Sequence, residues 1–155
     1  MPTPDFILAL RERIGTHPLW LPGVAAVVVR GDEVLLVQRA DSGSWTPVTG
    51  ILDPGEEPAV GAVREVLEET RVVATAERLV WAHATPEVTF GNGDRAAFLS
   101  LCFRCAWVSG EPVVGDDESR ATGWFCLDAL PEMSPDNLRR VELAVADGPH
   151  AVFAT

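Results

Sequence analysis

The sequence is short of positive charge. It contains 12 Lys and Arg residues against 23 Asp and Glu residues, which gives a formal net charge of -11. A protein that holds nucleic acid through a general basic surface needs clustered cations to neutralise phosphates, so this class is not expected. A small anionic substrate is compatible with the composition if cations screen its charge.

Cysteine is also scarce. The three cysteines are an odd number in a chain without an export signal, which favours a reducing cytoplasm over a disulfide framework. Cys102 and Cys105 have the CxxC spacing of redox and zinc motifs, but they lie in an apolar, strand-like run, where positions three apart face opposite sides. We therefore expect these two residues and Cys126 to be buried core residues.

Long apolar runs are missing. "VAAVVV" is far too short to cross a bilayer, and the apolar patch near the amino terminus has no basic start, so we expect neither a membrane span nor a secretion signal. A GxSxG elbow, a glycine-rich phosphate loop and a histidine metal pair are absent as well. The length of 155 residues and the hydrophobic share of 47% predict one folded domain over residues 1–155.

The chain alternates helical and strand-like segments. Residues 4–15 have a helical pattern that the prolines of "THPLWLPG" end, so residues 1–21 are predicted to form an N-terminal helical arm. The remaining predicted elements are strands at 24–30 and 33–39 joined by a tight turn, a short strand near residue 45, strands at 72–83, 97–108 and 121–127, and helices at 58–70 and 135–146. This order predicts a mixed sheet with helices on its faces, an α/β or α+β sandwich.

The predicted helix at 58–70 contains "REVLEET", which adds three glutamates to an already acidic chain. A helical wheel places the aliphatic side chains opposite the acidic ones, with Val60, Val63, Val66 and Leu67 on one side and Glu65, Glu68 and Glu69 on the other. This pattern predicts a helix that packs on its apolar face and presents an acidic face. Like charges one turn apart repel, by a few tenths of a kcal/mol in solvent and several kcal/mol if partly buried.

A hard divalent cation would relieve that repulsion. Mg²⁺ and Mn²⁺ take carboxylate oxygens, and helical spacing presents several carboxylates to one ion. Gly61 lies on the same side as Glu65 and would allow a close approach to the backbone. From the helix alone, an ordinary solvated surface is the other interpretation that stays open.

The residues upstream make the helix part of a longer pattern. Residues 50–72 resemble the signature of the Nudix hydrolases, with eight of nine defined positions in register: Gly50, Glu56, Arg64, Glu65, Val66, Glu68, Glu69 and Val72. The exception is Arg71, where the signature has glycine. The glycine of the signature is expected to end the helix in a left-handed conformation. A side chain such as arginine adopts that conformation at a cost of about 1 to 2 kcal/mol.

The resemblance implies an α/β/α sandwich with a mixed sheet, which belongs to the α/β class, and a loop-helix-loop that binds Mg²⁺ or Mn²⁺. It implies Glu68 and Glu69 as metal ligands, Glu65 as a ligand or base, and the Gly50 carbonyl as a further ligand. Arg64 is expected to orient the carboxylates through ion pairs.

Outside the signature, three residues are candidates for the same chemistry. Glu118 lies in a loop before a predicted strand and is our candidate for an additional catalytic glutamate, with a solvated turn as the alternative. Arg39 ends a strand and could meet a phosphate or the solvent. Trp45 could stack on a base or belong to the core.

Within the signature, Glu56 either supports the site or only favours the start of the helix.

The resemblance predicts a hydrolase that cleaves a diphosphate linkage in a nucleoside triphosphate, ADP-ribose or a nucleotide sugar. The alternative is a non-catalytic, nucleotide-binding regulatory domain, which would normally have lost glutamates. An isoprenoid diphosphate isomerase is disfavoured because its chemistry needs a cysteine outside the core. We expect a small nucleotide substrate and a homodimer in which the N-terminal arm is exchanged.

Overall fold

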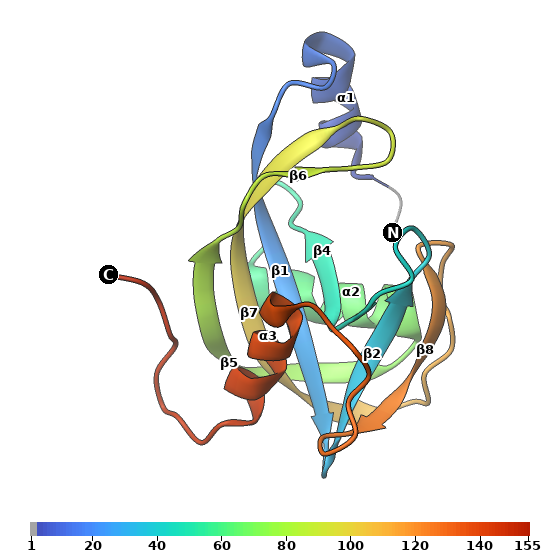
Figure 1. Ribbon diagram of the computed structural model, residues 1–155, viewed down its shortest axis with the longest axis vertical. Helices are drawn as coiled ribbons and strands as arrows, with labels where there is room; N and C mark the ends of the chain where they lie inside the picture. Colours follow the sequence, from blue (N-terminus) through green and yellow to red (C-terminus); the bar gives the residue numbers. More distant parts are fainter. Residues whose placement is uncertain (1–2) are drawn as a thin grey trace.

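The computed structural model describes residues 3–155. Within them the chain forms three helices and eight strands (Figure 1). In chain order these are α1 (Asp5–Ile14), β1 (Leu19–Arg30), β2 (Glu33–Arg39), β3 (Trp45–Thr46), β4 (Val48–Ile51), α2 (Pro58–Thr70), β5 (Val73–Ala84), β6 (Val88–Thr89), β7 (Arg95–Ser109), β8 (Ser119–Cys126) and α3 (Pro135–Val145). Every predicted helix and strand is present, and β4 and β6 are additions that the sequence did not reveal.

All described strands belong to one mixed sheet. Its main path runs β3-β2-β1-β7-β5, while β4 pairs with β1, β6 with β7 and β8 with β2. Strands β1 and β7 are parallel, and the other pairs are antiparallel. β1 is central because it pairs with β4 in its middle, with β2 at its end and with β7 along its other side.

Alternation along β1 builds two hydrophobic layers. Val24 and Val28 face the layer that α2 covers, whereas Ala25 and Val27 face the layer that α3 covers, as expected for a strand buried on both faces. Figure 1 shows α3 in front of β1 and α2 behind the sheet. The predicted α/β/α sandwich is therefore confirmed.

The N-terminal segment differs from its prediction in one respect. The helix ends at Ile14, and β1 begins at Leu19, inside the range 1–21 that was assigned to a helical arm. Pro22 is accommodated within β1, and its carbonyl accepts the N–H of Leu52. The start of β1 depends on its parallel pairing with β7, a long-range contact that local signals do not report.

The cysteines divide between core and surface. Cys105 belongs to the α2 layer and Cys102 to the α3 layer, so they face opposite sides as predicted, and burial raises the pKa of both thiols to about 12. Cys126 is exposed, and the prediction of a core position was wrong. This residue ends β8 opposite Glu33, the first residue of β2, at the rim of the sheet.

Among the described residues, no helix is both long enough and apolar enough to cross a membrane.

Candidate active site

The helix α2 has the bounds that the sequence predicted. It begins at Pro58, where a missing N–H is tolerated, and ends at Thr70. Arg71 follows with φ 60° and ψ 10°, and its N–H bonds to the carbonyl of Leu67. It is the only non-glycine residue with positive φ in the described part of the chain, so the position of the missing glycine does adopt the expected left-handed conformation.

The orientation of α2 differs from the helical-wheel prediction. Glu65 and Glu69 are 1% and 5% exposed, whereas Val60 and Leu67 are 58% and 47% exposed. The carboxylates therefore share the buried face with Val66 instead of lying opposite an apolar face.

Small residues explain this orientation. Gly61 and Ala62 lie on the buried face, where they let the helix approach the sheet closely. A Cβ on Gly50 would overlap the carboxyl group of Glu65, and a Cβ on Gly61 would overlap Leu52. Glycine at position 50, on β4, thus leaves the space that the Glu65 carboxyl group occupies.

Arg64 connects three carboxylates of the site. Its Nε and Nη2 donate to the two carboxylate oxygens of Glu56 at 2.7 and 2.8 Å, and its Nη1 donates to Glu65 at 2.9 Å and to Glu68 at 3.2 Å. The bond from Arg64 holds the pKa of Glu56 below its usual value. Glu56 therefore anchors the arginine, while Glu68 lies at the exposed rim of the site.

The two buried carboxylates resist ionisation. Burial raises the pKa of Glu65 to about 8, although Arg64 opposes the shift. Oε2 of Glu65 has no hydrogen-bond partner among the described residues. Burial also raises the pKa of Glu69 to about 7, and the charges of Asp116 and Glu118 add to the shift. When Glu65 and Glu69 are ionised, the hydrogen bonds and opposite charges of the described side chains do not fully offset the cost of burying their negative charges.

A loop between β7 and β8, residues 110–118, brings further acidic groups to the site; we call it the capping loop. The N–H of Gly115 donates to the carbonyl of Glu69 at 2.8 Å, and Glu118 accepts at its carbonyl from the N–H of Ala40 at 2.7 Å. The charge of Glu118 acts on Glu69, while its role as an additional catalytic glutamate stays a prediction. The sequence did not reveal Asp116, two residues before Glu118, as a second acid whose charge acts on Glu69.

Arg39, the last residue of β2, faces the same group of acids. Its Nε and Nη2 donate to Asp41 at 3.0 and 2.9 Å, and the pKa of the arginine is raised first by Asp41 and then by Glu118 and Glu69. The hydrogen bond with Arg39 lowers the pKa of Asp41 to about 2. The partner Asp41 was missed, although an acid two residues after a candidate phosphate ligand could have been noticed.

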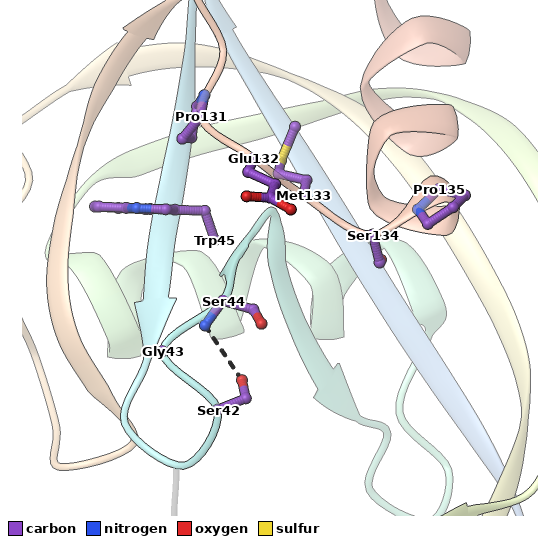
Figure 2. A pocket seen from close by; sticks show the side chains of 9 residues that line it. All are labelled: Ser42, Gly43, Ser44, Trp45, Pro131, Glu132, Met133, Ser134 and Pro135. Atoms are coloured by element: carbon purple, nitrogen blue, oxygen red, sulfur yellow. Dashed lines mark hydrogen bonds between the residues drawn. The ribbon is translucent and has the colours of Figure 1, made fainter.

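Trp45 lines a cavity. The cavity, of about 670 Å³, lies between residues 42–45 and residues 131–135 (Figure 2). The ring of Trp45 also meets Phe125 edge-on at 4.7 Å, so the tryptophan contributes both to the cavity and to the core. Trp45 and Met133, which both line the cavity, pack in the layer that α3 covers.

The donor set suits a hard divalent cation. Among the described residues no three His, Cys, Asp or Glu side chains already converge into a metal-binding group. However, Oε2 of Glu65 is buried without a hydrogen-bond partner, and Glu69 is buried beside two other acids. Oxygen ligands with uncompensated negative charge are what such a cation binds.

Comparison with known proteins agrees with this site. Residues 20–144 match the NUDIX domain, so the chain belongs to the NUDIX domain family. It is 32% identical over 136 residues to a MutT-like protein of Streptomyces ambofaciens, covering 86% of this chain and 82% of the relative. It is 34% identical over 119 residues to the NAD-capped RNA hydrolase NudC of Pseudomonas aeruginosa, covering 76% of this chain but 40% of NudC.

A solved MutT NUDIX hydrolase from Burkholderia pseudomallei has the same fold. The TM-score is 0.63 at 27% identity, covering 83% of this chain and 99% of the other. The prediction of a Nudix-type pyrophosphohydrolase is therefore confirmed at the level of family and fold.

Proposed function

We propose that the protein is a divalent-metal-dependent hydrolase that cleaves a diphosphate linkage in a nucleoside diphosphate derivative. The observation that carries this proposal is the burial of Glu65 and Glu69, whose pKa values are raised to about 8 and about 7. Burying carboxylates with incomplete compensation is costly, and a site that binds a cation has a reason to bear that cost. A regulatory domain that has lost catalysis would normally have lost glutamates, whereas all three glutamates of α2 are present.

The metal ligands in this proposal are the carboxylates of Glu65, Glu68 and Glu69 and the carbonyl of Gly50. The ion is Mg²⁺, with Mn²⁺ as a substitute, because both prefer oxygen ligands. When bound, such an ion neutralises charge on the diphosphate and lowers the pKa of water.

The protein side chains then supply orientation and a proton acceptor. Arg64 holds Glu65 and Glu68 in place through its hydrogen bonds, and Glu56 holds Arg64. Either Glu118 or, where it does not bind the metal, Glu65 accepts the proton of the attacking water. Burial raises the pKa of Glu65 to about 8, which is closer to neutrality than the pKa of a carboxylate in solvent.

The cavity beside Trp45 provides room for the nucleoside. Its volume of about 670 Å³ lies within the range of about 300 to 1,000 Å³ that is usual for ligand sites. The charges of Glu118 and Glu69 act on Arg39, which would meet phosphate groups after release from Asp41.

The substrate classes that we propose are nucleoside triphosphates, ADP-ribose and nucleotide sugars. NudC is named as a hydrolase of NAD-capped RNA, and this chain spans less than half of NudC. The net charge of -11 favours small nucleotides over RNA here.

We also propose a homodimer in the cytoplasm. The exposed apolar side chains of Leu8 and Leu10 on α1 and Trp20 on β1 support self-association through the N-terminal region. Sedimentation velocity that finds only monomers at micromolar concentration contradicts the dimer.

The central test is the Glu69→Gln variant. Glutamine keeps the shape of the side chain but removes the negative charge that a cation needs. We expect kcat to fall about 10²- to 10⁴-fold with Mg²⁺ and a panel of nucleoside diphosphate derivatives, with the circular dichroism spectrum unchanged. Product analysis should identify a nucleoside monophosphate or pyrophosphate.

The matched control is Glu12→Gln, which changes an exposed acid on α1 and should leave turnover unchanged. Unchanged turnover in Glu69→Gln would contradict the metal site. Tight nucleotide binding by calorimetry without turnover in the unmodified protein, with Mg²⁺ or Mn²⁺, would instead favour the regulatory domain.

A further inference from the structure

The end of α2 is held by the capping loop. The last carbonyls of a helix lack partners within the helix. Here the carbonyl of Glu69 accepts from Gly115 at 2.8 Å, and the carbonyl of Thr70 accepts from Val113 at 2.9 Å. Arg71 then donates through Nη2 to the carbonyl of Gly115 at 2.9 Å. Both backbone polar groups of Gly115 are therefore bonded to the end of α2.

The contact leaves little freedom. A Cβ on Gly115 would overlap the carbonyl oxygen of Glu68, and a Cβ on Gly110 would lie 2.9 Å from the carbonyl oxygen of Arg71. Gly110 also has φ 88°, a conformation that other residues rarely adopt. The backbone of the capping loop therefore fits against the end of the helix in one close arrangement.

The acids of the loop follow directly after this contact. Asp116 is the next residue after Gly115, and its Oδ1 accepts from the N–H of Glu118 at 3.1 Å. Both acids influence the pKa of Glu69. Two contacts therefore hold the segment that carries Glu118: the bonds of Gly115 to the end of α2 on one side and the bond from the N–H of Ala40 to the carbonyl of Glu118 on the other.

We propose that Arg71 is a positioning residue, which fixes the capping loop so that Glu118 faces the site. This inference rests on the proposed function, because it requires Glu118 to take part in the reaction. A glycine would end the helix without strain, but it has no side chain to bind the loop. Arginine adopts the left-handed conformation and adds a charged donor to a carbonyl of the loop.

Amide hydrogen exchange tests the structural part without metal or substrate. In the Arg71→Gly and Arg71→Ala variants, exchange at Val113 and Gly115 should become about five-fold faster, since one hydrogen bond of the loop is lost. Arg71→Lys keeps a charged donor and should restore most of the protection. Equal exchange in all variants overturns the proposal.

The two small variants separate the hydrogen bond from helix strain. Both lose the guanidinium group, but only Arg71→Gly relieves the left-handed strain. If the guanidinium group matters through the loop, both variants lower kcat about five-fold while KM changes little. A decrease in Arg71→Ala alone would show that the guanidinium group is dispensable once the strain is relieved, and would overturn the proposal.

A double-mutant cycle tests the route through Glu118. Glu118→Gln alone should lower kcat, and adding Arg71→Gly to it should cause no further decrease. Full additivity overturns the proposal, because Arg71 would then act elsewhere. If Glu69→Gln abolishes turnover and Glu118→Gln does not lower it, this inference fails while the proposed function stands. If Glu69→Gln has no effect, the proposed function itself fails.

Discussion

Single residues make the stability of this protein depend on pH in an unusual direction. Most paired carboxylates have lowered pKa values, but burial raises those of Glu65 and Glu69 to about 8 and about 7. Between pH of about 5 and about 8 the folded state therefore binds more protons than the unfolded state, so the free energy of unfolding falls as pH rises.

We expect the free energy of unfolding of the metal-free protein to fall by a few kcal/mol over this range. Below the usual carboxylate pKa this loss is absent, because both groups are protonated in the folded and in the unfolded state. Urea denaturation with a chelator at pH 5 and pH 8 measures it. Glu65→Gln should remove its own share of the pH dependence. Addition of Mg²⁺ at pH 8 should restore stability, because ligand binding favours the folded state. A protein that is more stable at pH 8 than at pH 5 without metal contradicts the prediction.

The identity of the site residues could be predicted from sequence better than their environment. The spacing from Gly50 to Glu69 located the acids on one helix. Their burial could not be predicted, because it depends on the contact of Gly50 with Glu65 across β4, a strand too short to show a pattern. The partner of Arg39 depends on the shape of the loop that follows β2, where Asp41 turns back to it.

Among the elements, α2 shows how a helical wheel can mislead. Val66 and Leu67 are neighbours on the apolar side of the wheel, yet Val66 is fully buried and Leu67 is half-exposed. The wheel weighs hydrophobicity, whereas close packing at this interface depends on the small residues Gly61 and Ala62. The type and the bounds of α2 were predictable because period, proline and turn residues are local signals.

A matched pair of substitutions tests this orientation. Val66→Ala should lower the free energy of unfolding by about 2 kcal/mol, since it leaves a cavity in the α2 layer. Leu67→Ala removes a larger side chain but should cost less than about 1 kcal/mol, because that side chain is half in solvent. Chemical denaturation at fixed pH measures both. A larger loss for Leu67→Ala would support the wheel instead.

At the scale of the whole molecule, the net charge of -11 opposes the approach of an anionic substrate. Screening should relieve this repulsion, since the Debye length falls from about 30 Å at 0.01 M to about 8 Å at 0.15 M ionic strength. We expect kcat/KM to rise with added monovalent salt over this range at saturating Mg²⁺, while kcat stays constant. Initial rates at low substrate concentration measure the effect. A fall in kcat/KM would mean that the cation-bearing site, not the net charge, governs encounter.

The fold class could be predicted from the alternation of elements and from the signature, but the strand order could not. The parallel pairing that joins Leu19 to Ala96 brings together segments with no shared local signal. The capping loop likewise meets α2 only because it connects β7 to β8, two strands that pair with different partners in the sheet.

The parallel pairing of β1 with β7 also sets when the site can form during synthesis. Every residue of the signature lies between these strands in the chain, so the ribosome releases the whole signature before β7 can pair with the other side of the central strand. Contacts so distant in sequence form late and slowly. A nascent chain that stops before Arg95 would contain every glutamate of α2 and still lack both the strand that completes the sheet and the loop that carries Glu118.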